Sequence, residues 1–550
     1  MPAPARRRRL ALRTGVAAWV VAVAMAARAA DEPVPPVDPV EAAAPVETDP
    51  NGPSCRLGGE VLQAYGIGSA WADLARMAQD VGAAPLRPDL FQRPGDRGIP
   101  LCADGPRLPM GRTAAPVPAG LRLDLVPATL GLYVNTGYPS SANDGLVWQG
   151  KGISSQLTAG VQFRWGILSA ALVPSVAWQQ NAPFPTLPTG LPGNLAYANP
   201  YYGPGLDVPQ QFGGSNYWTA SLGQSYVQLD YAGFGIGVST ENLWWGPGQR
   251  SSLLMTNTAP GFPHAYVGTV RPVDVWVGNL EANFWLGQVS RSKYFYTQDA
   301  AWFGAFTGDF ELRWVRGLYV GVVAVNVSSQ LTGGGEDRNS NTLIGGYGRW
   351  VFPPAGVEVY GEWTREDAWG SWNDFYKELD HSAGYTLGLQ KVFLGKDYWV
   401  RLLLEISDNN VPRPSREWRP NPTSYYVHGG NTGYTSGGQI LGAAMGPGSS
   451  SQYLGADVLA PAGWFGGWLE RTRRNDVYYM FGPPQGADGQ NDVEIGGGAR
   501  YLRSFGAFDL GASAGLYKRS AHDGLPVAWN LNAQVQLTWW PDRAIFAGPP

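Results

Sequence analysis

Two segments of the chain alternate strictly between apolar and polar residues, with the period of two that is typical of a β-strand. In the first, apolar side chains from Leu157 to Trp165 alternate with small or polar ones. In the second, eleven residues from Trp529 to Trp539 alternate without a break, and tryptophan stands at both ends. A strand that crosses a bilayer needs about 9 to 11 residues, apolar towards lipid and polar towards the lumen. Both segments therefore predict membrane-crossing strands.

Further segments show the same alternation less strictly. They are Tyr226 to Tyr231, Phe234 to Ser239, Asp274 to Leu286, Leu318 to Val327, Gly356 to Trp363, Tyr385 to Phe393, Tyr398 to Ile406 and Ala507 to Tyr517. Stretches rich in Gly, Pro and polar residues, at 181–214, 333–341 and 411–451, predict loops or a lumenal constriction. At about 10 residues per strand, residues 118–540 accommodate roughly 16 to 18 strands. We predict an all-β fold, a transmembrane antiparallel β-barrel over residues 118–540.

The period changes to that of a helix near the N-terminus. Apolar residues recur at helical spacing from Ala70 to Val81, between an N-cap at Ser69 and a stop at Gly82. We therefore predict a small periplasmic helical element at residues 54–117.

The chain has two cysteines, Cys55 and Cys102, and they bracket this helix. In an oxidising periplasm they are expected to form one disulfide. Two unpaired thiols are the alternative.

The first thirty residues predict a signal peptide that is cleaved on export. An arginine-rich start precedes an apolar run from Val16 to Ala27, which is too short to span a bilayer, and small residues follow at the cleavage position. Residues 31–53, rich in proline and acidic residues, predict a linker. Residues 541–550 form a C-terminal tail after the last predicted strand, although outer-membrane barrels commonly end on an aromatic residue.

The composition supports a barrel once this pattern is known. Mean hydropathy is only -0.18, yet the chain holds 74 Gly, 23 Trp and 26 Tyr and is only 15% charged. Alternating strands with aromatic girdles explain both features, because half of each strand faces a polar lumen. An exported β-sandwich array or a propeller is the competing interpretation.

Charge and histidine content narrow the range of partners. Six of the 40 basic residues leave with the signal peptide, so 34 remain against 44 acidic residues, a net charge of about -10. This balance argues against nucleic acid as a partner. The histidines at 264, 381, 428 and 522 lack metal-ligand spacing, so we expect neither a metal site nor a cofactor.

Four segments resemble the Wzi family of capsule assembly proteins. They are STENLWWGPGQRSSLLMTNTAPGFP from Ser239, GNLEANFWLGQV from Gly278, VYGEWTREDAW from Val359 and YYVHGGNTGYTSGGQILGAAMGPGS from Tyr425. The resemblance implies an 18-stranded barrel with a periplasmic helical element. It also implies a lectin-like surface protein that retains capsular polysaccharide, without catalysis.

The first of these segments predicts a sugar-binding site. Flat aromatic faces pack on the apolar side of a pyranose ring, and fixed polar groups take its hydroxyls. The candidate residues are Trp244, Trp245, Glu241 and Asn242, followed by a tight turn at Gly246, Pro247 and Gly248, and by Arg250 for an acidic sugar. The alternative is that the tryptophans belong to an interfacial girdle and that the turn only redirects the chain.

Two further clusters are candidates. The first is the charged group Glu362, Arg365, Glu366 and Asp367. It either props the barrel interior, contacts polysaccharide or supplies a glycosidase carboxylate pair. The second is Tyr425, Tyr426 and His428 with the glycine-rich run that follows. It forms either a ligand-shaping loop or a lumenal loop held by its own hydrogen bonds.

We therefore expect a non-enzymatic outer-membrane lectin that binds capsular or extracellular polysaccharide through many weak contacts. The expected partners are this polymer, outer-membrane lipid and the polysaccharide export machinery, and the expected state is a monomer, because a closed barrel has no free edge. A passive porin or sugar channel is the alternative function, and a glycan hydrolase on a soluble β fold is a further one.

Overall fold

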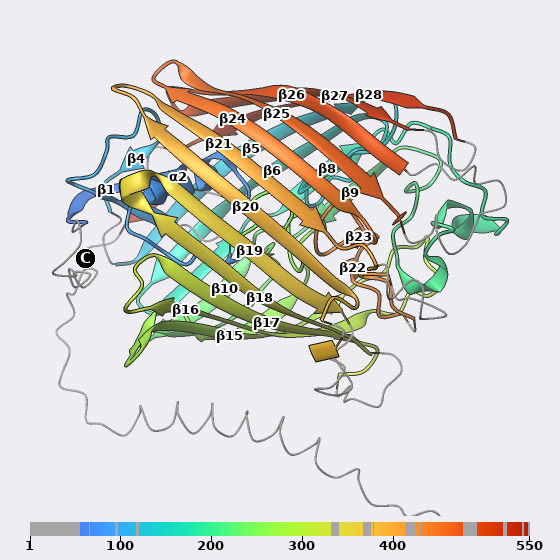
Figure 1. The fold of residues 1–550 in the computed structure, drawn as a ribbon, viewed down its shortest axis with the longest axis horizontal. Coiled ribbons are helices and arrows are strands. Elements are labelled where there is room, and N and C mark those ends of the chain that lie inside the picture. Colours follow the sequence, from blue (N-terminus) through green and yellow to red (C-terminus); the bar gives the residue numbers. More distant parts are fainter. Residues whose placement is uncertain are drawn as a thin grey trace, which may run out of the picture. The chain divides into compact units, whose positions relative to one another are not determined.

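The strands of the computed structural model form an antiparallel sheet that closes on itself as a barrel (Figure 1). The structure describes residues 55–64, 66–93, 97–116, 120–331, 340–366, 376–377, 379–412, 424–429, 431–476, 492–520, 525–541 and 544–547. The predicted signal peptide and linker lie outside these residues.

The wall of the barrel is built from short and long segments. They are β5 (Arg122–Asn135), β6 (Gly152–Trp165), β7 (Leu168–Leu172), β8 (Ser175–Gln179), β9 (Tyr217–Ser221), β10 (Tyr226–Tyr231), β11 (Phe234–Ser239), β13 (His264–Thr269), β14 (Val273–Val275), β15 (Gly278–Val289), β16 (Ala301–Leu312), β17 (Leu318–Ser328), β18 (Ser340–Phe352), β19 (Val357–Glu366), β20 (Ala383–Leu394), β21 (Trp399–Asp408), β24 (Ser450–Ala460), β25 (Gly463–Arg474), β26 (Asp492–Phe505), β27 (Phe508–Arg519), β28 (Ala528–Trp539) and β29 (Ala544–Ala547).

These 22 segments make 18 strands, because four strands are interrupted. β7 and β8 both run along β6, β13 and β14 along β15, and β28 and β29 along β5, while β9 and β10 run along β8 and β7. β5 pairs with β6 on one side and with β28 on the other, so the first and last strands meet. The predicted all-β barrel, with 18 strands, is confirmed.

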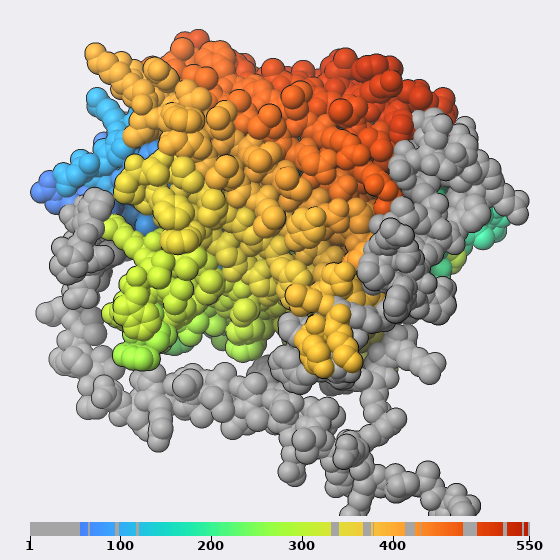
Figure 2. Space-filling model, in the orientation of Figure 1, coloured from blue at the N-terminus to red at the C-terminus, as the bar shows by residue number. Residues whose placement is uncertain are grey.

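Side chains alternate between lumen and outer surface along each long strand. In β21, Arg401 and Glu405 are buried on the lumen side, whereas Leu402, Leu404 and Ile406 are 39 to 42% exposed on the outside. Figure 2 shows how such strands join into a continuous outer surface. A surface of exposed leucine, isoleucine and valine around the whole wall suits lipid rather than water.

Aromatic side chains project outward where the turns between strands are short. They include Trp165, Tyr231, Trp276, Trp314 and Trp539. Such a girdle is typical of the membrane–water interface of a transmembrane barrel. Within the described residues, no helix is long and apolar enough to span a membrane.

The N-terminal element lies at the end of the barrel with short turns (Figure 1). It contains α2 (Ala70–Asp80), β1 (Leu57–Ala64), β2 (Phe91–Gln92), β3 (Arg97–Cys102) and β4 (Thr113–Ala114). Strands β3, β1 and β4 form a small sheet, and a disulfide joins Cys55 to Cys102. The helix begins where the sequence predicts, because the Ser69 hydroxyl accepts a hydrogen bond from the Ala72 amide at 3.2 Å.

Shorter elements lie in the loops. They are β12 (Trp244–Trp245), β22 (Thr435–Ser436), β23 (Gln439–Ile440) and the 3₁₀ turns Gly193–Tyr197, Gly203–Gly205 and Pro353–Ala355.

Buried ion pairs fasten α2 to the inside of the wall. The guanidinium of Arg76 on α2 lies 2.6 Å from the Glu358 carboxylate of β19, and Arg349 of β18 lies 2.8 Å from the same carboxylate. Arg349 also lies 3.8 Å from Asp80 at the end of α2. Since the side chains of Arg349, Glu358 and Asp80 are fully buried, each charge depends on its partners. The helix therefore acts as a plug bound to the barrel.

Replacing Arg349 by methionine should loosen this plug. It leaves the carboxylates of Glu358 and Asp80 buried with less compensating charge, and breaking a buried pair typically costs about 3 to 5 kcal/mol. We expect a lower midpoint of thermal unfolding in detergent, together with new conductance in planar bilayers.

Arg313→Met is the matched control, because the ion pair of Arg313 with Asp274 is 48% and 67% exposed and such pairs are worth about 0 to 1 kcal/mol. Equal midpoints for the two variants would show that the buried network does not hold the plug.

Candidate functional site

Two segments between barrel strands enter the lumen and pack against each other. The first inserted segment, residues 240–263, links β11 to β13, and the second, described at 424–429 and 431–449, belongs to the connection from β21 to β24. The Tyr434 hydroxyl of the second donates to the Leu254 carbonyl oxygen of the first at 2.7 Å. Side chains of both segments share a hydrophobic core with the wall from β13 to β18. One part of the lumen is therefore filled with protein.

The two candidate tryptophans belong to this core. Trp245 is fully buried, and its ring packs at centroid distances of 5.6 Å from Trp285 and 5.9 Å from Phe303. Trp244 is 4% exposed and donates its indole N–H to the Gly248 carbonyl oxygen at 2.9 Å. The structure thus leaves neither ring free to stack on a sugar and places neither in a girdle. Both anchor the first inserted segment.

Two wall carboxylates hold the backbone of the same segment. Glu362 accepts hydrogen bonds from the amides of Gly248 at 2.8 Å and Leu253 at 2.9 Å. Glu405 accepts from three consecutive amides, residues 249–251, at 2.7 to 3.0 Å, and from the Tyr360 hydroxyl at 2.6 Å. Glu362 lies on the lumen side as expected, and it serves the interior rather than a ligand.

The predicted turn of Gly246, Pro247 and Gly248 requires glycine at its first position. Gly246 has a φ of +122°, and a Cβ there would lie 2.3 Å from the Glu362 carboxylate and 2.4 Å from the Ser252 hydroxyl. The segment reaches the carboxylate because no side chain stands between them.

The two candidates before the tryptophans also stabilise the interior. Glu241 is 1% exposed and pairs at 2.8 Å with Arg93, which lies next to β2 in the N-terminal element. The Asn242 amide donates to the Ala259 carbonyl oxygen at 2.9 Å. The first contact joins the N-terminal element to the first inserted segment, and the second closes a bond within that segment.

The second inserted segment is held by Glu366, which accepts the Tyr426 amide and the Asn341 side-chain amide, the latter at 3.0 Å. The Tyr426 hydroxyl donates to the Leu253 carbonyl oxygen, and Tyr425 is 1% exposed. Both tyrosines therefore act in packing.

His428 and Arg365 are the other candidates that the structure describes. The His428 imidazole lies 2.8 Å from the Thr432 hydroxyl, and Arg365 is 1% exposed. Asp367 lies outside the described residues. Among the described residues, no group of three or more His, Cys, Asp or Glu side chains could hold a metal ion.

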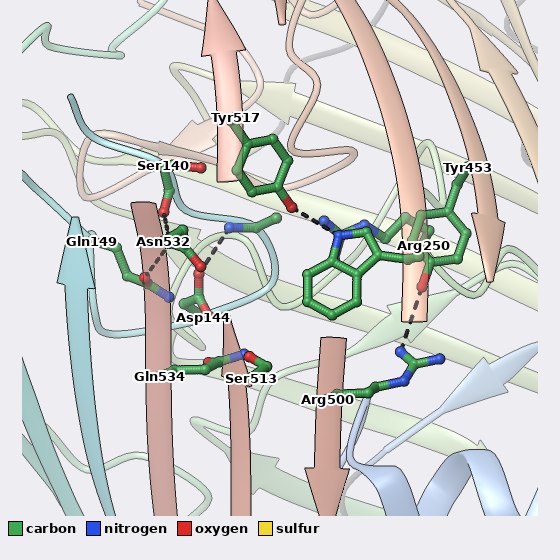
Figure 3. Close-up of a pocket in the computed structure, with 12 residues that line it drawn as sticks. Ser140, Asp144, Gln149, Arg250, Tyr453, Arg500, Ser513, Tyr517, Asn532 and Gln534 are labelled. Atoms are coloured by element: carbon green, nitrogen blue, oxygen red, sulfur yellow. Dashed lines mark hydrogen bonds between the residues drawn. The ribbon is translucent and has the colours of Figure 1, made fainter. Parts of the chain in front are cut away.

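A polar cavity of about 140 Å³ lies between the wall from β24 to β28 and the loop that follows β5 (Figure 3). It is lined by Ser140, Ala142, Asp144, Gln149, Arg250, Tyr453, Trp468, Arg500, Ser513, Tyr517, Asn532 and Gln534. Hydrogen bonds order the lining: the Trp468 indole donates to the Tyr517 hydroxyl at 2.9 Å, and the Asn532 amide donates to Gln149 at 3.1 Å. The cavity therefore combines three aromatic rings with fixed polar groups.

Each charged group of the lining has its own partner. Arg250 pairs with Glu470 at 2.9 Å, and Arg500 forms two hydrogen bonds of 2.7 Å with Asp457. The Asp144 carboxylate accepts the Ala142 amide at 2.8 Å and the Ser141 hydroxyl at 2.9 Å. Burial raises the pKa of Asp144 to about 6.

Of the residues predicted to bind polysaccharide, Arg250 alone lines this cavity. The aromatic lining residues were missed, although they occupy lumen-facing positions of alternating strands. The signal was present in part, because Asn532 and Gln534 lie on the polar face of the strand from Trp529 to Trp539. A search for aromatic residues at lumen-facing positions of the predicted strands would have identified the site.

A closed barrel of 18 strands, with an apolar outer wall, an aromatic girdle and a plugged lumen, defines an integral outer-membrane protein. The family model "Capsule assembly protein Wzi" matches residues 126–476. The chain belongs to the Wzi family of capsule assembly proteins. No curated protein matches the sequence.

Solved structures resemble this chain at low sequence identity, and the first of those below has a TM-score above 0.5. The Escherichia coli outer-membrane protein Wzi, described as a carbohydrate-binding β-barrel involved in group 1 capsule assembly, is 14% identical, with a TM-score of 0.53 over 75% of this chain and 83% of its own. Acinetobacter baumannii OccAB2 is 10% identical, with a TM-score of 0.42 over 76% and 98% of the two chains. Pseudomonas aeruginosa OprD is 10% identical, with a TM-score of 0.41 over 76% and 94%.

Glu405→Gln should release the first inserted segment. The substitution places an amide N–H against backbone N–H groups, and an unsatisfied buried donor costs about 1 to 3 kcal/mol. We expect trypsin to cleave after Arg250 roughly tenfold faster or more in detergent, with the fragments identified by mass spectrometry.

Glu470→Gln is the control, because Glu470 pairs with the side chain of Arg250, whereas Glu405 binds the backbone of the turn. If both variants resist trypsin like the wild type, Glu405 does not hold the turn.

Asp144 should make stability depend on pH. Its pKa is about 6 in the folded protein, against an ordinary value of 3.8. Between these values the folded state keeps a proton that the unfolded state loses, so the free energy of unfolding falls as the pH rises from about 4 to about 6. Calorimetry in detergent should show the wild type losing stability relative to Asp144→Asn across this interval. Parallel curves for the two proteins would contradict the assignment.

Proposed function

We propose that this protein binds exported polysaccharide in its lumen and at its outer loops, and so retains the polymer at the cell surface. The lumenal cavity is the observation that carries this proposal, because it brings Tyr453, Trp468 and Tyr517 together with amide and guanidinium groups. Aromatic faces pack on the apolar side of a sugar ring, while fixed polar groups bind its hydroxyls. Membership of a capsule assembly family and the carbohydrate-binding Escherichia coli barrel with the same fold support it.

Retention does not require a tight single site. A sugar polymer presents the same unit many times, so one chain contacts several barrels, and weak contacts at each combine into strong attachment. Outer-membrane barrels carry their longer loops on the outside of the cell. The loop that follows β5 and lines the cavity is of this kind. The polysaccharide export machinery is the partner that would deliver the polymer.

A passive channel is less well supported. The inserted segments share a core with the wall, and α2 is fixed to the opposite end by buried ion pairs. Among the described residues, the inserted segments and the helix therefore narrow the path through the lumen. We therefore expect ion conduction in variants in which the plug is loosened.

A glycosidase would need two carboxyl groups facing the sugar, about 5 to 9.5 Å apart. Among the described residues that line the cavity, Asp144 is the one carboxylate. Glu362 is occupied by backbone amides of the inserted segment. Binding without cleavage is the function that these groups support.

Trp468→Ala should shift polysaccharide from the cell surface into the medium. Loss of one aromatic contact weakens each sugar contact by about 1 kcal/mol, roughly fivefold, and attachment through many contacts amplifies the effect. The measurement is the ratio of cell-attached to released polymer, at constant total polymer, in a deletion strain complemented with each variant.

Trp529→Ala is the matched control, because Trp529 lies on the outer face of the barrel and is 57% exposed. The heat-dependent shift of folded barrels in electrophoresis shows which variants are assembled. If deletion of the gene leaves the ratio unchanged, retention is the wrong function and the channel becomes the leading one.

A further inference from the structure

The positive and negative charges of the side chains around the lumenal cavity nearly cancel one another without a ligand. The guanidinium of Arg250 is paired with Glu470, and that of Arg500 donates two hydrogen bonds to the single carboxylate of Asp457. These two pairs leave the Asp144 carboxylate as the third charged group of the lining. With both arginines neutralised, the lining and its immediate partners carry a small excess of negative charge at neutral pH.

The neighbouring groups do not reverse this balance. Arg401, at the base of β21, lies 3.7 Å from Asp457 but also 2.9 Å from Asp73 of the plug. The carboxylate of Glu405 lies behind Arg250 and binds its backbone amide. Arg250, Arg401 and Arg500 therefore each have a carboxylate partner, so these described residues offer no uncompensated positive charge for an acidic group.

The uncharged part of the lining is suited to hydroxyl groups. Gln149, Ser513, Asn532 and Gln534 each supply donors or acceptors, and the aromatic rings supply apolar faces. A carboxylate, in contrast, would meet guanidinium groups whose charge is already neutralised, by Glu470 at Arg250 and by Asp457 at Arg500. Glu470 is the more accessible of these two carboxylates, because its side chain is 14% exposed and that of Asp457 is fully buried.

We propose that the cavity takes an uncharged sugar unit of the polymer and rejects a uronic acid, and that Glu470 sets this preference by neutralising Arg250. This inference rests on the proposed function, since it assigns a sugar class to the same site. It differs from the expectation from sequence, in which Arg250 faces an acidic sugar.

The test uses matched pairs of methyl glycosides that differ only at C6, with glucose, galactose or mannose against the corresponding uronic acid. Binding to the full-length protein in detergent is followed by saturation-transfer NMR at pH 7.5. For the wild type, we expect the neutral member of a pair to bind about fivefold or more tightly than the acidic member. In Glu470→Gln, affinity for the uronosides should rise about fivefold or more, with the neutral glycosides changed less than about twofold.

Glu494→Gln is the matched control, because Glu494 pairs with Arg474 in the same lumen and does not line the cavity. It should retain the wild-type preference. Lower ionic strength should increase the uronoside affinity of Glu470→Gln, as expected for a freed guanidinium.

The outcomes separate the two claims. Preferred binding of uronosides by the wild type, lost in Trp468→Ala, would overturn the assigned sugar class and leave the proposed function intact. Failure of every glycoside to bind, or binding that Trp468→Ala does not weaken, would overturn sugar binding in the cavity and this inference with it.

Discussion

The structure depends on satisfying the backbone amides of segments that leave the wall and enter the lumen. Inside the sheet, neighbouring strands supply every partner, but an inserted segment has no such neighbours, and a buried N–H without an acceptor is costly. Glu362 and Glu405 supply these acceptors from the wall, because Glu405 accepts three consecutive amides and Glu362 accepts the amides of Gly248 and Leu253. The turn at Gly246 brings the backbone close enough for these bonds to form. The interior is thus organised around buried carboxyl groups that accept hydrogen bonds from backbone amides.

This arrangement divides the lumen. On the side of β13 to β18, both inserted segments and the wall share one hydrophobic core. On the side of β24 to β28, wall side chains remain available and form the polar cavity. Arg250 lies at the border, since its amide is bound by Glu405 and its guanidinium pairs with Glu470 of β25. The first inserted segment, which contains one of the four stretches that resemble the Wzi family, therefore mainly supports the cavity, and Arg250 is its residue in the lining.

Sequence alone predicted the architecture because every barrel strand alternates between lipid-facing and lumen-facing side chains, and because the helix has its own distinct spacing. The alternation from Trp529 to Trp539 and the helical spacing from Ala70 to Val81 both correspond to elements in the structure. The candidate site was harder to predict. Trp244 and Trp245 follow a strand and precede a glycine turn, a pattern that suits an exposed platform and an inserted segment equally well. Only the folded chain shows that the segment turns inward and buries both rings.

Apart from Arg250, the cavity residues escaped prediction for a related reason. Gln149, Arg250, Tyr453 and Asn532 are far apart in the chain, and closure of the barrel brings them together. A local sequence motif cannot indicate that residues so far apart in the chain lie close together in the fold. The sequence does specify which side chains face the lumen, but the curvature and register of the wall decide which of them meet.

The seam of the barrel passes beside the cavity. Asn532 and Gln534 come from β28, the loop with Asp144 and Gln149 directly follows β5, and these two strands are the ones whose pairing completes the cylinder. A barrel still open at this seam would hold the two halves of the site apart. Under the proposed function, the complete cavity could bind polymer only after β5 and β28 have paired, so closure of the barrel would have to precede binding.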